Sequence, residues 1–559
     1  MRYMRKITII TLLSLLLPLG VAMAQESKRV EVTTIYRPEV GQATKLLAPT
    51  TLADSPTMDV EVTYDIKPET WSIELQDQNF KAATATFWDY NRSRRGYMKL
   101  GVGAPLGSDV QLRYATQNNR VGYFGIALTH DGGFSKQSNC EGVERPRSQS
   151  YDMRNELALF GGVYAGRQMF EASLSGDYDI YNRYAELGDN PFCAQFGRSA
   201  LTLRYGDDFT DLSHINFSVE AHGDYWAHPV LRGDVISLAG EYNVGGLVKM
   251  AREFKGNSVG LYAGYYMWSG IFPFDYLDTR FSAGVDYSYN FGIVDLELGV
   301  GYMYDKVRGR DKASHIVLPS AKLLFNLKTP AIAPYLELDT NVSQNGAAAL
   351  YAENPYLSFD AMIEQLSSMA NTRSYDLTAG FTGVLSQSRF AYRAYVGFSF
   401  VRDDMFWYVP TPGLFAASTA NNKRLIAGAE LQYRPIANLL IGVGGHYRYD
   451  MNESSYVVSE PSWIADAIVE YRIKKFKVYA MTDVIGRREW SDMSSDTGLF
   501  TTPTKVDLRA GVSFVVSQKC EIYVDGYNLL NRTGDKAIYD YAYYYRNGIG
   551  FMAGVKLSF

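Results

Sequence analysis

The stretch Phe551-Met552-Ala553-Gly554-Val555-Lys556-Leu557-Ser558-Phe559 ends the chain and alternates in polarity. One face carries Phe551, Ala553, Val555, Leu557 and Phe559, and the other carries Met552, Gly554, Lys556 and Ser558. Every second side chain of a β-strand lies on the same side, so one face can meet lipid while the other meets water. We therefore interpret this stretch as the closing strand of a transmembrane β-barrel, signalled by Phe551, Val555, Leu557 and Phe559.

The opposite end of the chain has the features of a secretory signal peptide. Arg2, Arg5 and Lys6 precede an apolar run over residues 7–19, and Ala22-Met23-Ala24 has the pattern of a cleavage site. We predict a signal peptide over residues 1–24, with the mature chain beginning at Gln25. The run is shorter than the roughly 20 residues that span a bilayer as a helix. Since the first cysteine is Cys140, we expect neither a helical anchor nor an amino-terminal lipid.

The composition agrees with an all-β membrane protein. Hydrophobic residues make up 47% of the chain and aromatic residues 14%, with 43 Tyr, yet no later apolar run is long enough for a helical span. Because lipid offers no water to backbone polar groups, such a chain enters a membrane by closing a sheet on itself. The net charge of -5 argues against nucleic acid as a partner, since nucleic-acid binders carry a basic surface. A soluble secreted β-protein is the alternative.

Segments of alternating polarity recur from about residue 97 onward, joined in turn by tight turns and longer polar loops. In one hairpin, Phe281, Ala283, Val285 and Tyr287 lead through a turn at Asn290 and Gly292 to Val294, Leu296, Leu298, Val300 and Tyr302. Short turns on one side and long loops on the other are typical of outer-membrane barrels. Counting back from Phe559 predicts about 22 antiparallel strands, an even number as in bacterial barrels, the first near Tyr97–Ala104.

The predicted domains are the signal peptide, an irregular arm over residues 25–95 and an outer-membrane barrel over residues 96–559. The arm contains four prolines and lacks regular alternation, so we expect it in the periplasm or in the lumen. The longest predicted surface loops, where binding specificity would lie, are 131–154, 181–198, 342–374, 401–423, 485–504 and 531–547. Within one of these loops, Ser358–Met369 is expected to form a short helix.

Several stretches resemble a known family. Tyr523–Arg532, which reads YVDGYNLLNR, is followed by a loop and a last strand ending in Phe559, and this arrangement resembles the end of TonB-dependent receptor barrels. Other stretches resemble a group of receptor-like barrels without a plug: Tyr36-Arg37-Pro38-Glu39-Val40, Gly96-Tyr97-Met98-Lys99-Leu100-Gly101, Asn354-Pro355-Tyr356 and Asn371-Thr372. The resemblance implies a receptor-type barrel in the cell outer membrane.

The chain departs from the wider receptor family in one respect. Energised receptors carry a large amino-terminal plug inside the barrel, and the arm is too short for one. Val30, Glu31, Val32 and Thr33 form either a TonB-contacting segment or an ordinary linker or β-augmenting strand. Comparably large outer-membrane barrels keep the lumen plugged. We therefore expect the arm, infolded loops such as 342–374, or a partner protein to fill it.

No residue pattern predicts a catalytic group, a cofactor or a metal site. His214 and His222 are expected on one inward face, but eight residues at ~3.4 Å each place them too far apart to share an ion. Acidic residues recur at expected inward positions and favour either a cation-selective lumen or ordinary cross-strand pairing. These acidic residues are Glu171, Asp177, Asp179, Asp295, Glu297, Glu337, Asp339 and Glu430, and the basic ones on the same faces are Lys99, Arg113 and Arg393.

Two further groups of residues are predicted in the surface loops. Cys140 and Cys193 fall in successive loops, where a disulfide is permitted in a secreted protein, although Cys520 leaves an odd number. The loop before the last strand holds an aromatic cluster that either binds a sugar or a partner or belongs to an aromatic belt at the membrane interface. The cluster consists of Tyr539, Tyr541, Tyr543, Tyr544 and Tyr545.

The resemblance and the wide lumen lead to two functional hypotheses. The first is a receptor-like barrel without its own plug that acts with partner proteins, such as lipoproteins or another barrel. It would serve as a gated conduit or as a subunit of an outer-membrane assembly or export complex. The second is a passive or TonB-energised uptake channel for a bulky nutrient. A purely structural barrel is a third alternative, and no enzymatic activity is expected. The expected partners are outer-membrane lipid and proteins, not nucleic acid.

Overall fold

The computed structural model describes residues 95–116, 121–134, 152–181, 194–232, 235–271, 276–327, 329–385, 389–411, 413–451, 460–493, 496–532 and 548–559. In chain order the elements are β1 (Gly96–Ala104), β2 (Gly107–Ala115), β3 (Gly122–Gly133), β4 (Asp152–Ala165), β5 (Gln168–Tyr181), β6 (Ala194–Gly206), β7 (Asn216–Arg232), β8 (Val235–Phe254), β9 (Asn257–Ile271), β10 (Tyr276–Asn290), β11 (Val294–Lys306), β12 (Ser314–Phe325), β13 (Ala333–Ser343), α2 (Ala347–Glu353), α3 (Phe359–Leu366), β14 (Thr372–Leu385), β15 (Phe390–Thr411), β16 (Leu414–Tyr433), β17 (Leu439–Asp450), β18 (Trp463–Ile473), β19 (Phe476–Ile485), β20 (Arg488–Asp492), β21 (Leu499–Thr502), β22 (Lys505–Ser517), β23 (Cys520–Tyr527) and β24 (Gly550–Ser558).

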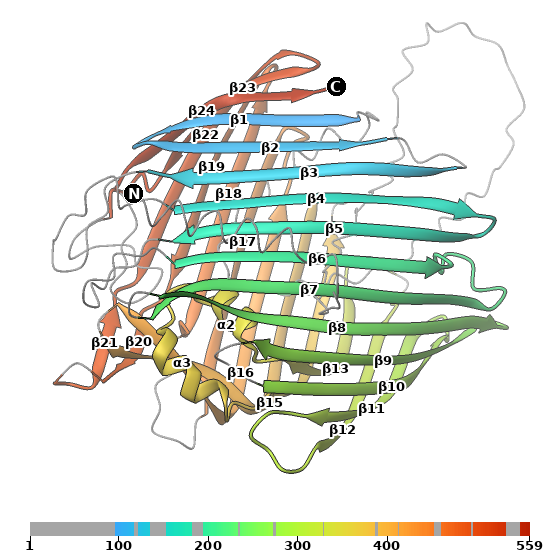
Figure 1. Ribbon diagram of the computed structural model, residues 1–559. Helices are drawn as coiled ribbons and strands as arrows, with labels where there is room; N and C mark the ends of the chain where they lie inside the picture. The colour runs from blue at the N-terminus through green and yellow to red at the C-terminus, as the bar shows by residue number, and fades with distance from the viewer. Residues whose placement is uncertain are drawn as a thin grey trace, which may run out of the picture. The chain divides into compact units, whose positions relative to one another are not determined.

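The strands form one closed antiparallel barrel (Figure 1). Its last strand, β24, pairs with β1, and the backbone groups of Gly96 and Phe559 exchange two hydrogen bonds of 2.8 and 2.9 Å at this junction. Since β19 pairs directly with β22, the hairpin of β20 and β21 lies outside the wall, and 22 strands form the barrel. The predicted fold class, strand number and closing strand are therefore confirmed.

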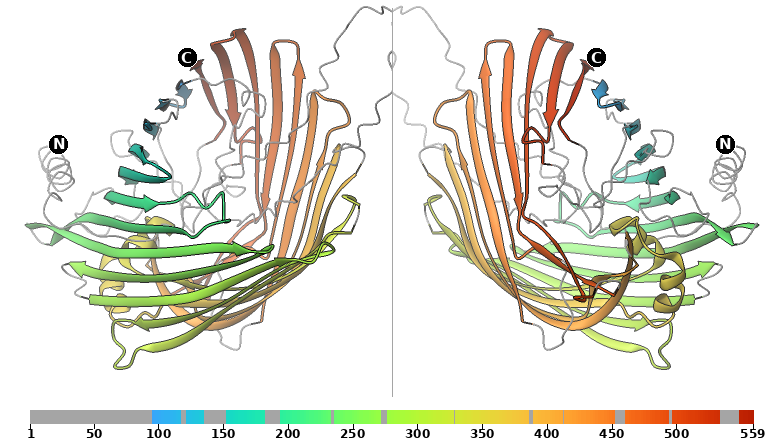
Figure 2. Two further views of the ribbon diagram at one scale, coloured as in Figure 1. Left: turned by 90° about the vertical axis from the view of Figure 1, so that its right-hand side faces the viewer. Right: turned by 90° about the vertical axis from the view of Figure 1, so that its left-hand side faces the viewer.

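The two ends of the barrel differ in their connections. At one end, two-residue turns join β4 to β5, β8 to β9, β18 to β19 and β22 to β23. The β8–β9 turn has Lys255 and Gly256 at φ values of 50° and 83°, as a type I′ turn requires. The opposite end carries the long connections. Figure 2 shows the barrel from two further sides. Because periplasmic turns are short and surface loops long, we call the two ends the turn end and the loop end.

Alternating side chains give the wall an apolar outer face. On β10 and β11, the exposed residues Val285, Leu298 and Val300 lie on one face, while Asp305 and Arg280 on the other face are buried. This confirms the hairpin predicted over residues 281–302. No helix among the described residues is long and apolar enough to cross a membrane.

Several strands are much longer than the roughly 9–11 residues that a β-strand needs to span a membrane. β15 and β16 have 22 and 20 residues and remain paired as far as Thr411 and Leu414. The prediction of a loop over 401–423 is therefore wrong, because the polar residues there belong to strands that project above the membrane. The β20–β21 hairpin lies within the predicted loop 485–504, and β20 pairs in parallel with β15.

One junction of the wall is paired over a much shorter length than its neighbours. β12 pairs with β11 from Ser314 to Phe325, but it pairs with β13 only between Ala321–Leu324 and Tyr335–Leu338. Pro319, which has no N–H to donate, lies just beyond this pairing, where the Thr340 hydroxyl donates to its carbonyl at 2.7 Å. The Val342 carbonyl accepts from Arg280, an inward side chain of β10. The end of β13 therefore leans towards the lumen.

Candidate functional site

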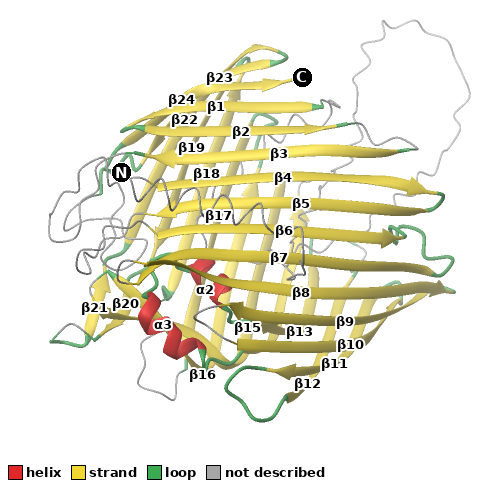
Figure 3. Ribbon diagram, viewed as in Figure 1, coloured by secondary structure: helices red, strands yellow, loops and turns green. Residues whose placement is uncertain are grey.

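Both described helices lie in the connection between β13 and β14, over residues 344–371, and Figure 3 shows them together at the loop end. The prediction of a helix within Ser358–Met369 is confirmed by α3. The Ser358 side chain caps this helix by accepting a hydrogen bond from the Ala361 N–H at 3.4 Å. The first helix, α2, was not predicted. Its N-cap, Gly346, has no side chain to give a capping signal.

The first helix of this loop lies inside the barrel. On β7, Val219 is exposed on the outer face, so Trp226 and His228 project from the inner one. The ring of Tyr351 on α2 lies 5.2 Å from the Trp226 ring and 5.4 Å from the His228 ring, measured between centroids. It also lies 5.3 Å from the ring of Phe196 on β6. Because its contacts are with inward side chains, α2 occupies part of the lumen at the loop end.

The start of α2 is held by a fully buried carboxylate of the barrel wall. Ala348 N–H donates to Glu241 Oε2 at 3.4 Å, and Ala347 N–H donates to the Tyr276 hydroxyl oxygen at 3.2 Å. The Tyr276 hydroxyl in turn donates to Glu241, which is 0% exposed. The first N–H groups of a helix have no partner within it. The wall therefore supplies the acceptors that this short helix lacks.

A second anchor is the ion pair of Arg308 and Asp278. Arg308 follows β11 and donates through Nη2 and Nε to Asp278 Oδ2 at 2.5 and 3.0 Å, while its backbone N–H donates to Oδ1 at 2.7 Å. Its guanidinium carbon lies 3.5 Å from the ring centroid of Tyr276. Arg308 Nη2 also donates to the Asn345 carbonyl at 3.4 Å. One buried cation thus links β10 to the first residues of the infolded loop.

A third buried group closes the base of the loop. Asn371 Nδ2 donates to both carboxylate oxygens of Asp305 at 3.1 Å, and Arg280 Nε donates to Asp305 Oδ1 at 3.3 Å. Asn345 donates through its backbone N–H to the Asn371 side chain at 3.2 Å and through Nδ2 to the Ala370 carbonyl at 2.7 Å. These bonds tie together the two ends of the loop, so its entry and exit points are fixed.

The opposite side of the loop packs against apolar surface on β15, β16 and β20. Leu357 bridges to Phe415, and the Ser358 N–H donates to the Phe415 carbonyl at 2.7 Å. Trp407 Nε1 donates to Glu353 at 2.9 Å. The remaining contacts are made by a buried apolar cluster, which from the loop includes Leu350, Leu357, Met362, Leu366 and Met369 and from the wall and the β20 hairpin includes Trp407, Val409, Phe415, Ala416, Ala417 and Trp490.

These contacts hold loop 344–371 in a fixed position inside the barrel. It is tied to the β8–β11 wall by buried charges and to the β15–β16 wall by apolar packing, so it spans the inside of the mouth. Burial of an apolar side chain contributes roughly 1.5–3 kcal/mol, and breaking a buried ion pair costs about 3–5 kcal/mol. The loop is therefore a fixed constriction of the lumen. The sequence prediction that loop 342–374 helps to fill the lumen agrees with this arrangement.

Most sequence-predicted site residues lie elsewhere. Cys140, Cys193, Val30–Thr33 and Tyr539–Tyr545 lie outside the described residues. Phe551, Val555, Leu557 and Phe559 lie at the barrel closure, where the Phe559 ring occupies the space that a side chain at position 96 would need. A larger residue at position 96 would therefore require the Phe559 ring to move.

Charged side chains on the inner wall form cross-strand pairs. Arg204 contacts Glu171 at 2.5 Å, Arg198 contacts Asp224 at 2.5 Å, and Lys99 contacts Asp109 at 2.5 Å. Of the two interpretations of the inward acidic residues, these contacts favour ordinary pairing across the lumen wall. No group of His, Cys, Asp or Glu among the described residues has the arrangement of a metal site.

One histidine position differs from the prediction. His214 lies in the turn before β7 rather than on the strand, because the Asn216 side chain donates back to the His214 carbonyl at 3.0 Å and to the Asp211 carbonyl at 2.7 Å. His222 is buried on β7, with its ring centroid 5.6 Å from that of Tyr266. The two histidines therefore do not share a strand.

Comparison with solved structures identifies the type of barrel. The copper transporter OprC matches with a TM-score of 0.64 and 14% identity, over 83% of this chain and 81% of that chain. The FrpB iron transporter from Neisseria meningitidis matches with a TM-score of 0.65 and 11% identity, over 84% and 82%. This chain has the fold of a receptor-type outer-membrane barrel. The predicted receptor-like architecture of the barrel is thus confirmed at the level of fold.

A further neighbour is the siderophore receptor PirA from Acinetobacter baumannii, with a TM-score of 0.63 and 11% identity over 83% of this chain and 80% of that one. These three neighbours are described as transporters or a receptor, not as enzymes. No protein-family model and no curated protein matches the sequence. At this level of identity the similarity establishes the fold of the barrel alone.

Proposed function

We propose that this protein is a receptor-like outer-membrane barrel without a plug of its own, which acts with partner proteins. It would serve as a gated conduit or as a subunit of an outer-membrane assembly or export complex. The observation that carries the proposal is the loop 344–371, which hydrogen bonds to buried charged groups of the wall and an apolar cluster hold inside the loop end of the lumen. A loop fixed in this way narrows the mouth but has no evident means of opening by itself, so gating falls to another component.

We assign residues 1–24 to a signal peptide, 25–95 to a periplasmic or lumenal arm and 96–559 to the barrel. A large barrel with an open lumen would leak. The arm or a partner is then needed to complete the seal that loop 344–371 begins.

Isolation of the tagged barrel from membranes in a mild detergent, followed by mass spectrometry, tests the proposal. We expect a companion in stoichiometric amount, either a lipoprotein or a second barrel. A variant that lacks residues 28–92 separates two roles of the arm. Loss of the companion would assign the arm to partner binding, and a rise in antibiotic leakage would assign it to sealing. Recovery of a clean monomer from wild-type membranes would overturn the proposal.

The second candidate function is an uptake channel for a bulky nutrient, either passive or energised by TonB through Val30–Thr33. Its support is the fold shared with copper and iron transporters and a siderophore receptor. This function predicts flux of ions or sugars in liposomes that contain the barrel alone. It also predicts a growth defect on one nutrient when the gene is deleted. Absence of both effects, together with a stable companion, would favour the complex subunit.

Two groups of surface-loop residues belong to this proposal. A disulfide between Cys140 and Cys193 would fix two loops beside the mouth, and its presence is tested by mass spectrometry of unreduced peptides. Tyr539, Tyr541, Tyr543, Tyr544 and Tyr545 would provide aromatic contacts for a partner or a sugar. Replacing three of these tyrosines with serine should weaken recovery of the companion if they bind it, whereas residues of an aromatic belt would leave recovery unchanged.

A further inference from the structure

Two arginines face each other on the outer surface of the barrel at its loop end. Arg373 on β14 lies opposite Arg402 on β15, and the pairs below them are Tyr375 with Phe400 and Leu377 with Phe398. Leu377 and Phe398 are exposed on the outer face of the wall. Since alternate residues of a strand share a face, Arg373 and Arg402 project outward as well, above the apolar band.

The two cations have no carboxylate to separate them. Like charges directly opposite each other destabilise a sheet. The Arg402 side chain makes no hydrogen bond or ion pair with any described residue, and its guanidinium carbon lies 5.8 Å from the centroid of the Phe400 ring. Arg373 Nη2 donates to Ser314 Oγ at 2.7 Å, while its Nε is buried without a partner. The pair thus lacks an anion.

The surrounding charges reinforce this conclusion. Lys423 on β16 lies opposite Phe400 and therefore shares the outward face, which adds a third cation. The carboxylates at this height are already paired with other arginines. Asp403 binds Arg310 at 3.1 Å, and Asp404 binds the inward Arg424 at 2.6 Å. The two arginines therefore have no carboxylate partner among the described residues at this height.

Below the cations, the outer face becomes aromatic and then aliphatic. Tyr375 and Phe400 form the next level together with Lys423, followed by Leu377, Phe398, Leu425 and the exposed Tyr449. Aromatic residues mark the membrane interface, and an apolar band marks the hydrocarbon core. This order places Arg373 and Arg402 at the level of the lipid headgroups in the outer leaflet.

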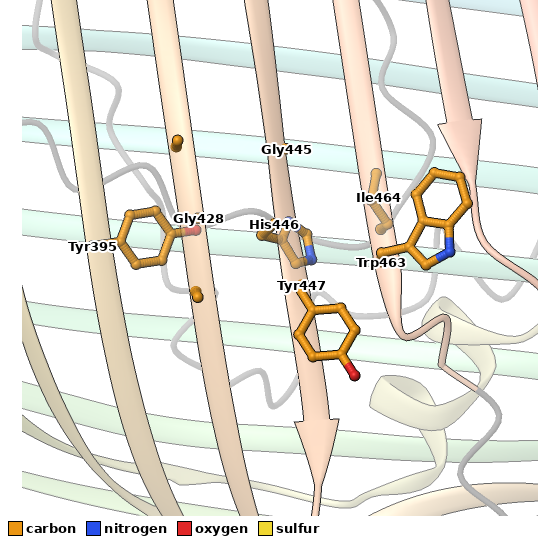
Figure 4. Close-up of a pocket in the computed structure, with 9 residues that line it drawn as sticks. Tyr395, Gly428, Gly445, His446, Tyr447, Trp463 and Ile464 are labelled. Atoms are coloured by element: carbon orange, nitrogen blue, oxygen red, sulfur yellow. The ribbon is translucent and has the colours of Figure 1, made fainter.

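A shallow hollow of about 470 Å³ lies in the wall formed by β16–β18, below Lys423 (Figure 4). Its lining comes from both faces of the wall, because the exposed Tyr447 and Trp463 project outward whereas Tyr395 and His446 lie at inward positions of their strands. Ala427, another lining residue, follows Lys423 by four residues, which corresponds to roughly 14 Å along a strand. The hollow is thus at the depth that acyl chains occupy below a headgroup bound at the cations.

We propose that Arg373 and Arg402 bind a phosphate group of an outer-leaflet lipid, whose acyl chains lie over the outer face of β14–β17. A phosphate between the arginines replaces their repulsion with charge-assisted hydrogen bonds. The planar guanidinium can bind a phosphate through two parallel hydrogen bonds. The proposal concerns the outer surface of the barrel and is independent of the function assigned to its lumen.

The test uses the full barrel in a mild detergent and a lipid A that carries two phosphates. Native mass spectrometry measures the fraction of barrel that retains this lipid, for the wild type and for Arg373→Gln/Arg402→Gln. The matched control is Arg252→Gln. Arg252 projects outward at the turn end of β8, 4.6 Å from the Phe254 ring centroid, so it is a similar residue at the other interface.

We expect the dissociation constant of the double variant for the phosphorylated lipid A to be at least about tenfold higher than that of the wild type. The control variant should bind this lipid as the wild type does. Equal retention by the double variant would overturn the proposal. Equal retention of lipid A without phosphates would overturn the role of the phosphate. Competition by inorganic phosphate at the same concentration would overturn the assignment to a lipid.

A second measurement separates binding from folding. In lipid-free detergent, Arg402→Gln removes a like-charge contact, so the variant should unfold at a temperature no lower than the wild type. Addition of the phosphorylated lipid A should raise the unfolding temperature of the wild type more than that of the variant. A lower unfolding temperature of the variant without lipid would assign Arg402 a structural role and overturn the proposal.

Discussion

The two walls that hold the infolded loop use different chemistry. Towards β8, β10 and β11 the loop is held by buried charges, with Arg308 and Asp278 in direct contact at 2.5 Å. Towards β15, β16 and the β20 hairpin it is held by apolar side chains such as Met362 and Trp490. Buried charged contacts require a defined geometry, because a buried charge that loses its partner destabilises the fold. Apolar contacts tolerate small shifts but contribute most of the burial. The charged wall thus sets the position of the loop, and the apolar wall holds it there.

The largest effect is expected from Arg308→Met. This change leaves Asp278 buried without its cation, at a cost of roughly 3–5 kcal/mol, and should release loop 344–371 from the β10 wall. Hydrogen exchange of the loop and the conductance of the barrel in planar bilayers should both rise. Arg310→Met is the control, since its side chain is 40% exposed compared with 3% for Arg308, and an exposed pair contributes less than about 1 kcal/mol. Equal effects of the two variants would contradict the role of the charged wall.

On the apolar wall, Met362→Ala should cost about 3 kcal/mol, because it leaves a cavity around α3. Met362 is 0% exposed. The expected result is faster hydrogen exchange in α3 with little change at the start of α2, since the charged anchors remain. Met493→Ala is the matched control, because Met493 is 72% exposed and loses little on truncation. If exchange at α2 also became faster, the apolar wall would help to set the position of the loop, and the two walls would not have separate roles.

Glu241→Gln tests whether the negative charge of Glu241 is needed to hold the start of α2. The amide oxygen of glutamine can still accept from Tyr276 and Ala348, so the variant loses the charge but keeps its acceptor. Hydrogen bonds to charged groups contribute about 1 kcal/mol more than neutral ones. We therefore expect a small rise in exchange at the amides of Ala347 and Ala348. Release of the whole loop, as expected for Arg308→Met, would show that the negative charge itself fixes the loop.

The smallest effect is expected at the turn end, where Asp207 holds the turn before β7. Burial alone would raise the pKa of Asp207, but hydrogen bonds from the Phe217 N–H, Arg167 and Gln168 lower it below its ordinary value. A lowered pKa gives stability that is present above the unfolded-state pKa, near ~4, and is lost as pH falls through the folded one. Exchange in residues 207–215 should therefore stay slow at pH 5 and rise below pH ~4. In Asp207→Asn this pH dependence should disappear. Arg167, the charged partner, is 54% exposed, which keeps the effect small.

The sequence predicted those parts of the fold that depend on local alternation. The hairpin around Asn290 and the closing strand at Phe559 follow from a period of two, which lipid on one face and water on the other impose on every strand. Residues 401–423 were misjudged as a loop, because strands that rise above the membrane need no apolar face. The alternation is lost there although the pairing continues.

The anchors of the infolded loop were not predictable from one sequence. Glu241 accepts from Ala348, which lies 107 residues later in the chain, and Arg308 meets Asp278 across a hairpin. Each of these residues looks like an ordinary inward polar residue of a strand or turn. Their roles depend on where β13 delivers the loop, and that path depends on the tertiary structure. The only local signals were the stretches Asn354-Pro355-Tyr356 and Asn371-Thr372.

The short pairing between β12 and β13 makes the wall mechanically uneven. Lateral tension in a membrane acts around the whole circumference of a barrel, but strands separate where the fewest backbone hydrogen bonds join them. This junction is paired only over Ala321–Leu324, next to junctions paired along nearly the full strand length. The barrel therefore has one line along which its girth can change most easily. That line borders the strand that carries the constricting loop, so a change in girth would reach the mouth directly.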